Sequence, residues 1–284
     1  MKKFLLLVIF TLTLGFVHAQ LHINLFGGFA NYFGDLQSKA YTTQQSHAAV
    51  GAGIQYDLTH HFSVLTNLTY GKVGASDSYN LPADLKARNL SFTTPIFEWN
   101  VLGEYNLLDM NTHKFTPYIF AGIAIYHFNP YAYDSLGRKV DLRPLSTEGE
   151  GLAQYPDRKP YALTQLAIPF GGGIKLRVSD HVVLAYEIGL RKLFTDYLDD
   201  VSSRYVDQTI LLNAKGPEAV AMAYRGDELK GGSPYPPAGA VRGNPAHKDW
   251  YYMSGIRVSI DLDSKSLSAH RRSNGIYDCP KKVY

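Results

Sequence analysis

The feature that most constrains this chain is a long, strict alternation of side-chain character. Residues 48–58 show it best: Val50, Ala52 and Ile54 share one face, and Gly51, Gly53 and Gln55 share the other. A period of two is typical of β-strands whose two faces meet different surroundings. The pattern recurs in about eight segments, near 22–33, 48–58, 62–71, 97–107, 115–127, 166–178, 182–191 and 250–262. We therefore expect an all-β protein of about eight antiparallel strands.

The links between these segments alternate in length. The links at Thr59–His61, Leu108–Lys114 and Ser179–His181 are short, whereas those near 34–47, 72–95, 128–163 and 192–249 are long. Outer-membrane barrels have short periplasmic turns and long external loops, so this asymmetry favours a transmembrane β-barrel. Within the last long link, residues 206–225 have helical spacing from Glu218 to Tyr224, and residues 231–245 are too rich in proline to be regular.

Charged residues fall on the face opposite the apolar one. They are Glu98, Glu104, Lys175, Arg177, Glu187, Arg191 and Arg257. The packed core of a soluble β-sandwich or lipocalin-like barrel would exclude them. Aromatic residues such as Trp99 and Tyr70 are expected near strand ends, as in interfacial girdles. In an eight-stranded barrel the lumen is just filled by side chains, so we expect these charges to pair and close it; the alternative is a selective pore.

The N-terminus predicts export. Lys2 and Lys3 precede the apolar segment 4–16, and Val17-His18-Ala19 forms a small-residue cleavage site, so residues 1–19 read as a signal peptide. No cysteine follows the cleavage site, so a lipoprotein is not expected, and no later apolar run is long enough for a transmembrane helix. If residues 20–262 cross a membrane, they can do so only as a closed barrel, and we expect that barrel to contact outer-membrane lipid.

The alternation stops at Leu262 and leaves a tail, residues 263–284, on the periplasmic side. Its five basic side chains outnumber two acidic ones, and it holds the only cysteine. We expect this polar tail to order on binding a partner. The candidate partner-binding residues are Arg271, Arg272, Cys279, Lys281 and Lys282. The net charge of +3 for the whole chain gives no signal for nucleic acid.

No constellation predicts catalysis. His47 or His127 with nearby Ser and Asn could mimic a lipase site, but the spacing of a nucleophile elbow is absent. The adjacent His60 and His61 are expected in a solvated turn. A further set of carboxylates suits calcium in type but not in spacing, so a hydrated acidic loop base is the preferred interpretation; it comprises Asp196, Asp199, Asp200 and Asp207. We therefore expect a non-enzyme without metal or cofactor.

Four segments resemble a family of outer-membrane β-barrels from Bacteroidota. They are Asn31-Tyr32-Phe33-Gly34-Asp35-Leu36, Phe194-Thr195-Asp196-Tyr197-Leu198-Asp199-Asp200, Asp249-Trp250-Tyr251-Tyr252-Met253-Ser254-Gly255 and the terminal Cys279-Pro280-Lys281-Lys282. The best-known member of that family is PorG, an outer-membrane component of the type IX secretion system. The resemblance implies a role in a protein secretion complex, with periplasmic and outer-membrane proteins as partners. The alternatives are a small channel, a passive structural barrel or a membrane-embedded lipid enzyme.

Overall fold

The computed structural model describes residues 20–37, 42, 44–80 and 82–262. The expected signal peptide and the basic tail lie outside these residues. Eight long strands form the barrel: β1 (Gln20–Phe33), β2 (His47–Asp57), β3 (Phe62–Ser76), β4 (Ser91–Asn106), β5 (Phe115–Phe128), β8 (Thr164–Arg177), β9 (Val182–Leu193) and β10 (Trp250–Asp261). Each pairs antiparallel with its neighbour along the chain, and β1 pairs with β10 to close the cylinder. The prediction of a closed eight-stranded barrel is confirmed.

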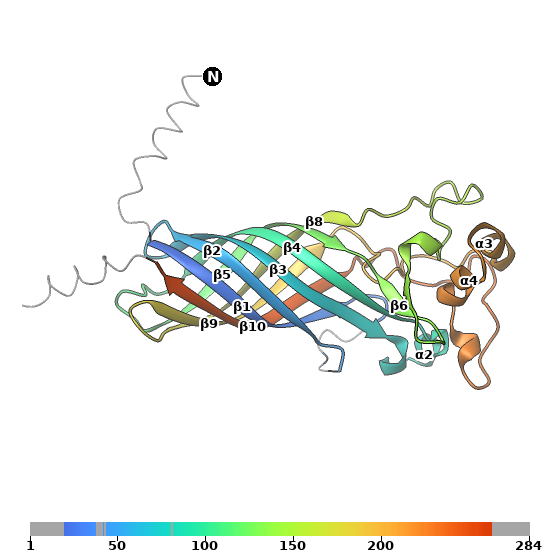
Figure 1. Cartoon of the computed structure of the whole chain (residues 1–284), viewed down its shortest axis with the longest axis horizontal. Coiled ribbons are helices and arrows are strands. Elements are labelled where there is room, and N and C mark those ends of the chain that lie inside the picture. The colour runs from blue at the N-terminus through green and yellow to red at the C-terminus, as the bar shows by residue number, and fades with distance from the viewer. Residues whose placement is uncertain (1–19, 38–41, 43, 81, 263–284) are drawn as a thin grey trace, which may run out of the picture.

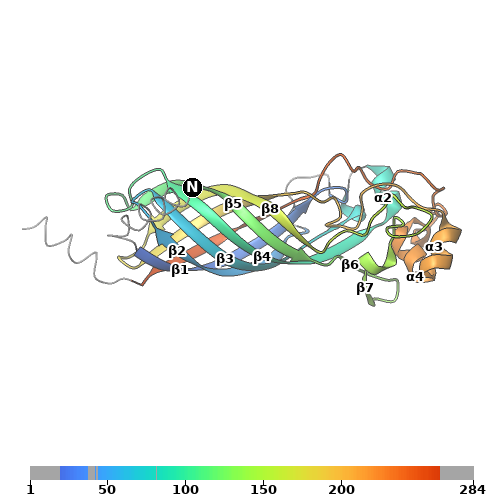
Figure 2. The same ribbon diagram turned by 90° about the horizontal axis from the view of Figure 1, so that it is seen from above.

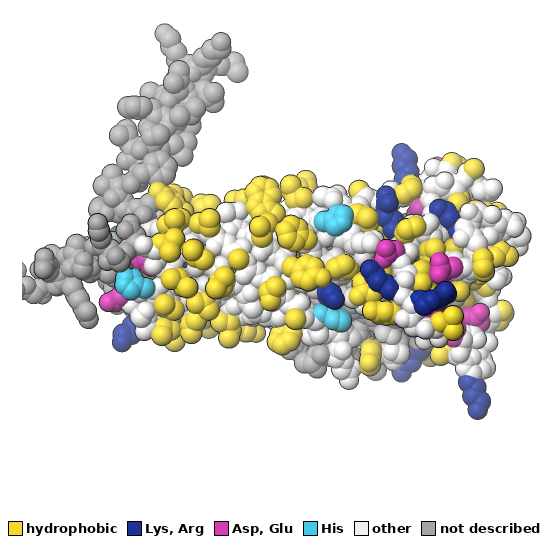
Figure 3. All heavy atoms as spheres, in the orientation of Figure 1, with side chains coloured by type: hydrophobic (Ala, Val, Ile, Leu, Met, Phe, Trp, Pro, Cys, Tyr) yellow, Lys and Arg dark blue, Asp and Glu magenta, His cyan; other side chains and the backbone are white. Residues whose placement is uncertain are grey.

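The outer wall of the barrel is apolar. Val50, Ile54 and Ile256 point outward and are 50–57 % exposed, and Ile123 is 68 % exposed. Hydrophobic side chains cover the middle of the face shown in Figure 3, whereas charged ones gather toward one end. Trp99 also points outward, but it lies near the middle of β4 and not at a strand end, because β4 begins earlier, at Ser91. The apolar wall is the surface that faces lipid.

The two ends of the barrel differ in size. Three short turns connect β2 to β3, β4 to β5 and β8 to β9 at one end, where β1 also begins and β10 ends. At the other end the long links build a cap (Figures 1 and 2). By the usual asymmetry of such barrels, the short turns are periplasmic and the cap is extracellular. β3 and β4 have 15 and 16 residues, more than the 9–11 or so that a tilted strand needs to span the membrane, so both continue into the cap.

The cap contains short elements. They are η1 (Asp77–Tyr79), α2 (Ala83–Arg88), the hairpin of β6 (Tyr131–Tyr133) and β7 (Lys139–Asp141), η2 (Arg143–Leu145), α3 (Gln208–Lys215), α4 (Pro217–Ala223) and η3 (Gly226–Glu228). The helix expected in 206–225 is present as α4, and 231–245 has no helix or strand. The sequence pattern missed α3, which begins where the Asp207 carboxylate accepts hydrogen bonds from the N–H groups of Thr209 and Ile210. Of the described helices, none is long and apolar enough to cross a membrane.

The packed interior runs from the barrel into the cap. In the extracellular half of the lumen, the largest buried cluster joins Tyr32, Tyr126 and Tyr251 to Leu198 of the cap. A smaller cluster fills the barrel around Leu65, Leu102, Tyr118 and Phe120, and a third packs α3 and α4 together. Because the first cluster crosses the mouth of the barrel, the cap and the extracellular half of the barrel form one packed unit.

Candidate functional site

The first group of buried charges lies in the periplasmic half of the lumen. Glu104 of β4 accepts hydrogen bonds from Lys175 of β8 and Arg257 of β10, and all three side chains are at most 5 % exposed. Arg257 also lies 3.4 Å from Glu187, which accepts a hydrogen bond from the hydroxyl of Tyr118 at 2.7 Å. The group therefore joins β4, β5, β8, β9 and β10 across the lumen.

The second group lies on the extracellular side of the first and centres on Glu98. Arg191 of β9 donates to both oxygens of its carboxylate, at 3.0 and 3.2 Å. The Tyr251 hydroxyl and the Asn100 amide donate to it at 2.5 and 2.7 Å. This two-pronged arginine contact is the strong form of a charge-assisted hydrogen bond. A buried carboxylate with four donors is fully satisfied, so the charge can remain inside the barrel.

Little space remains between these groups. The cavity that they border, together with Asn24, Asn67 and Phe120, has a volume of about 30 Å³. That volume holds two or three water molecules, at about 10–15 Å³ each. Side chains from opposite walls thus meet across the lumen, as the diameter of an eight-stranded barrel requires.

The structure brings together six of the seven charged residues expected in the lumen. Arg177 is the exception. It is the last residue of β8, is only half-buried, and pairs with no carboxylate among the described residues. The expectation for Arg177 is therefore wrong, because the alternation placed it on the inner face but not at the depth where water is excluded. At the periplasmic rim water can hydrate its charge.

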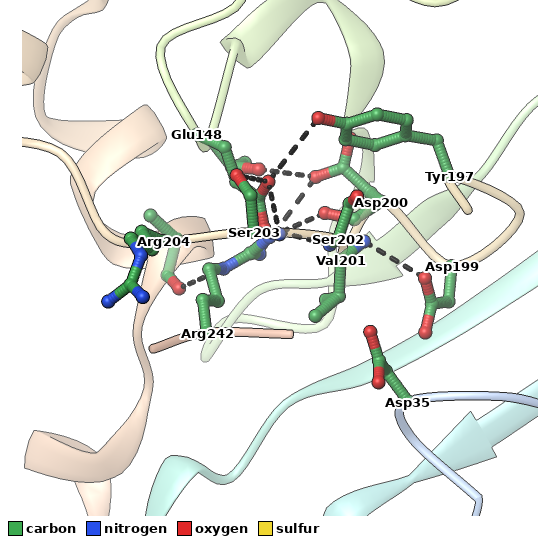
Figure 4. Close-up of polar contacts among 12 residues, drawn as sticks. Asp35, Glu148, Tyr197, Asp199, Asp200, Val201, Ser202, Ser203, Arg204 and Arg242 are labelled. Carbon is green, nitrogen blue, oxygen red and sulfur yellow. Dashed lines mark hydrogen bonds and ion pairs between the residues drawn. The ribbon is translucent and has the colours of Figure 1, made fainter. Parts of the chain in front are cut away.

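A third polar cluster fills the base of the cap (Figure 4). Arg242, 3 % exposed, donates to Glu148 at 3.0 Å and to the backbone carbonyl of Asp200 at 2.5 Å. Glu148 in turn accepts hydrogen bonds from the backbone N–H groups of Ser202 and Ser203 at 2.9–3.0 Å. Asp200 accepts from Thr147 and Tyr161 at 2.6 and 2.7 Å. This cluster binds the β5–β8 link to the β9–β10 link.

At the mouth of the barrel, one hydroxyl joins two carboxyl groups. The Tyr32 oxygen lies 2.6 Å from Asp199 and 2.8 Å from Asp249, and all three side chains are at most 1 % exposed. A hydroxyl has one hydrogen to donate, so the second contact needs a proton on one of the carboxyl groups. Burial raises the pKa of both Asp199 and Asp249 well above the usual range, which supplies that proton.

Other carboxyl groups of the cap are also held toward their neutral form. Burial raises the pKa of Asp196 to about 7 and that of Asp200 to about 6. Burial, reinforced by the charges of Asp200 and Glu148, raises the pKa of Glu150 to about 8. The seven buried carboxyl groups of the cap face two buried arginines, Arg88 and Arg242, among the described residues. Protonation therefore offsets much of the excess negative charge.

These observations correct the expectations for the acidic loop. Asp196, Asp199 and Asp200 are at most 2 % exposed, so the loop base is buried and not hydrated. Within the described residues, no group of three or more acidic, His or Cys side chains could hold a metal ion. Asp207 lies apart from the others as the N-cap of α3. The three buried acidic residues of this segment therefore take part in hydrogen bonds within the cap.

Comparison with protein families gives one match. The model of a family described as "Domain of unknown function (DUF6089)" matches residues 2–212, which is more than half of the chain. The chain belongs to the DUF6089 family. The matched range includes seven of the eight barrel strands and ends within α3. No curated protein matches the chain.

Solved barrels are similar to this DUF6089 protein at low identity. Neisserial surface protein A is 8 % identical, with a TM-score of 0.43, and the match covers 86 % of this chain and 99 % of the other. Ail of Yersinia pestis is 6 % identical, with a TM-score of 0.41, covering 87 % and 100 %. OprG of Pseudomonas aeruginosa is 10 % identical, with a TM-score of 0.38, covering 86 % and 97 %. Its own strand pairing makes the DUF6089 protein a closed, eight-stranded antiparallel β-barrel with an apolar outer wall.

The remaining candidates of this family member lie at its surface. His60 and His61 occupy the β2–β3 turn, where they contact Asn111 at 2.7 Å and the Asn106 carbonyl at 2.8 Å, so they tie neighbouring turns together. His127 contacts Thr164 at 2.9 Å on the outer wall. The partner-binding candidates Arg271, Arg272, Cys279, Lys281 and Lys282 lie outside the described residues.

Sequence reasoning missed the residues that organise the cap. Glu148 and Arg242 are 94 positions apart in links without periodicity. Asp77 and Arg88 form a second two-pronged ion pair at 2.7–2.8 Å that fastens the β3–β4 link. No local pattern marks any of these four residues. Asp249 is different, because it opens one of the motifs that resemble the Bacteroidota family. Its contact with Tyr32 shows what this residue does in the structure.

Proposed function

We propose that this protein is a non-enzymatic, non-conducting outer-membrane barrel that serves as a docking component of a protein secretion complex, of the type IX kind. The observation that carries the proposal is the sealed interior. Ion pairs cross the lumen, the residual cavity is about 30 Å³, and a packed cap covers the mouth. If the lumen does not conduct, the parts of the protein that can interact with other molecules are the outer wall, the turns and the tail.

The resemblance to the family that includes PorG supports the choice of complex. Its three motifs within the barrel region are far apart in sequence but converge in space. Tyr32 from the first motif contacts Asp199 from the second and Asp249 from the third. Gly34 of the first motif packs there too, since a Cβ at this position would lie 2.1 Å from the Asp249 carboxyl. Three short matches that build one buried cluster are a more specific signal than three isolated ones.

The periplasmic tail is the proposed docking element. The three periplasmic turns are short and present only small surfaces, whereas 22 residues follow Leu262 in the sequence. Their basic side chains suit an acidic partner surface, and charge of this kind mainly sets the association rate and its salt dependence. In an oxidising compartment, Cys279 would form a disulfide with a partner protein.

Truncation after Asp263 tests the proposal. The truncated protein should insert and resist heat like the parent, because the barrel ends at β10, but periplasmic components of the secretion complex should no longer co-purify with it. Cys279→Ser in the full chain is the companion variant and should remove any high-mass band on non-reducing gels. Retention of the complete complex and of secretion by the truncated protein would move the docking site to the turns at Thr59–His61, Leu108–Lys114 or Ser179–His181.

A further inference from the structure

A groove lies at the extracellular ends of β3 and β4. These two strands continue past the lipid-facing wall toward β6 (Figure 1). Gly74 and Ser76 of β3 and Ser91 and Thr93 of β4 line it, together with Gln45, His47, Tyr79 and Tyr133. Its volume is about 270 Å³. That is close to the lower end of the range for small-molecule sites, about 300–1,000 Å³. The groove is separate from the lumen and from the buried cap cluster.

The groove is bordered by small side chains and bare backbone. At Gly74 a Cβ would lie 2.8 Å from the carbonyl oxygen of Phe92 and 3.0 Å from His47 Nε2, so a larger residue would displace its neighbours. Ser76, Ser91 and Thr93 add hydroxyl groups next to this bare position. The glycine therefore allows His47 to pack closely against β3 at the edge of the groove.

One amide group and two exposed aromatic rings border the same space. Gln45 accepts a hydrogen bond from the Ser76 N–H at 2.9 Å through its carbonyl oxygen, which leaves its amide N–H groups without a partner in the part of the chain that is described. The rings of Tyr79 and Tyr133 are 53 % and 52 % exposed. Aromatic rings pack against the C–H faces of sugar rings, and amide and hydroxyl groups bond to sugar hydroxyls. This combination fits a saccharide.

The residues on the membrane side of the groove indicate what kind of molecule would carry such a saccharide. Tyr70, Lys72 and Gly74 occupy successive outward positions on β3, and they pair with Phe97, Pro95 and Thr93 on β4. Tyr70 and Phe97 belong to the lipid-facing wall and are 45 % and 51 % exposed. Lys72 is exposed and makes no ion pair with any described residue. From the membrane outward, the wall therefore changes from apolar and aromatic to cationic, and then to polar.

That order matches the parts of a phosphorylated glycolipid in the outer leaflet, with acyl chains in the bilayer and phosphorylated sugars above them. We propose that the groove binds the sugar headgroup of such a lipid while Lys72 contacts its phosphate. A basic side chain at the membrane surface attracts anionic lipid, and the groove adds selection for the sugar. The inference does not depend on a role in secretion, because it rests on the outer wall alone.

Titration of the full-length protein, purified in detergent, with bisphosphorylated lipid A tests the proposal. Lys72→Gln should weaken binding about fivefold, the loss expected for one surface lysine. Lys192→Gln is the matched control, since Lys192 is an exposed, outward lysine on β9, away from the groove, and binding should not change. With dephosphorylated lipid A, the parent and Lys72→Gln should bind equally, whereas Tyr133→Ala should weaken the binding of both lipids.

A heat-induced mobility shift on gels, unchanged from the parent, confirms that each variant is folded. Three results would overturn the proposal: no binding of lipid A by the parent, equal losses for Lys72→Gln and Lys192→Gln, or equal affinity of the parent for lipid A and for phosphatidylglycerol. The second result would assign the binding to overall charge, and the third would show that the groove does not select for sugar.

Discussion

The lumen and the cap both bury many charged residues, but they neutralise them differently. In the lumen, the carboxylates of Glu98, Glu104 and Glu187 pair directly with cations, which are Lys175, Arg191 and Arg257. In the cap, seven buried carboxyl groups face two arginines among the described residues, and raised pKa values leave several of them protonated. The lumen is thus held by ion pairs across strands, whereas the cap depends on bound protons. The two regions should respond differently to mutation and to pH.

The largest effect is expected in the lumen. Glu104→Gln leaves Lys175 buried without a carboxylate, which costs about 3–5 kcal/mol because an uncompensated charge remains inside. Urea unfolding in detergent measures the loss. Adding Lys175→Met should recover part of it, because the double variant removes the orphaned charge. Arg177→Gln is the control and should change stability by less than about 0.5 kcal/mol. Equal stability of Glu104→Gln and Arg177→Gln would contradict the account of the lumen.

The outer wall should be nearly as sensitive. Arginine at Ile54 or Leu184, both outward-facing, should cost roughly 2–4 kcal/mol where the side chain lies near the bilayer midplane. The expected readout is a lower fraction of barrel inserted into lipid vesicles and a lower temperature for the heat-induced mobility shift. Variants that insert and resist heat like the parent would show that these positions do not face lipid.

The pH dependence should separate the cap from the lumen. A carboxyl group whose pKa is raised on folding binds more protons in the folded state, so it stabilises the fold below its unfolded pKa, about 4, and loses that contribution as pH rises through the folded value. For Glu150 this window ends near pH 8, and for Asp196 near pH 7. Amide exchange in residues 194–249, corrected for its intrinsic rate, should therefore be faster at pH 9 than at pH 5.

Glu150→Gln should reduce this dependence, because the neutral amide replaces the protonated acid. The barrel strands supply the internal control, and their protection should stay constant over the same range because lumen ion pairs need no added proton. Equal protection of the cap at pH 5 and pH 9 would contradict the proton-bound description. Faster exchange at pH 5 than at pH 9 would show that protonation destabilises the cap, the opposite of the expected effect.

The comparison also shows what the sequence can reveal. Alternation predicts the number of strands, the face on which each side chain lies and the six paired lumen residues. It can do so because a barrel wall repeats every two residues regardless of distant contacts. Arg177 shows the limit, since alternation assigns a face but not a depth. The cap follows no period. Its Glu148–Arg242 contact joins positions 94 apart, and its β6–β7 hairpin has strands of three residues, too short to stand out from a loop.

The same limit applies to the acidic segment 196–200. Its composition suggested hydration or calcium, but burial of these side chains depends on Tyr32, Thr147 and Arg242, which arrive from other links. Only the assembled cap determines whether those carboxyl groups meet water, a cation or a proton. The groove beside Lys72 was likewise hidden, because its lining comes from four separate segments of the chain.

Planar-bilayer recording of the purified full-length protein tests the central claim, a sealed barrel, most directly. The ion pairs of Glu98 and Glu104 and the packed mouth border a lumen cavity of about 30 Å³, which is why we expect a sealed barrel. The account predicts no stable conductance for the parent, and the appearance of conductance when Glu104→Gln disrupts the lumen. Steady ohmic channels from the unmodified protein would contradict the claim and favour the small-channel alternative.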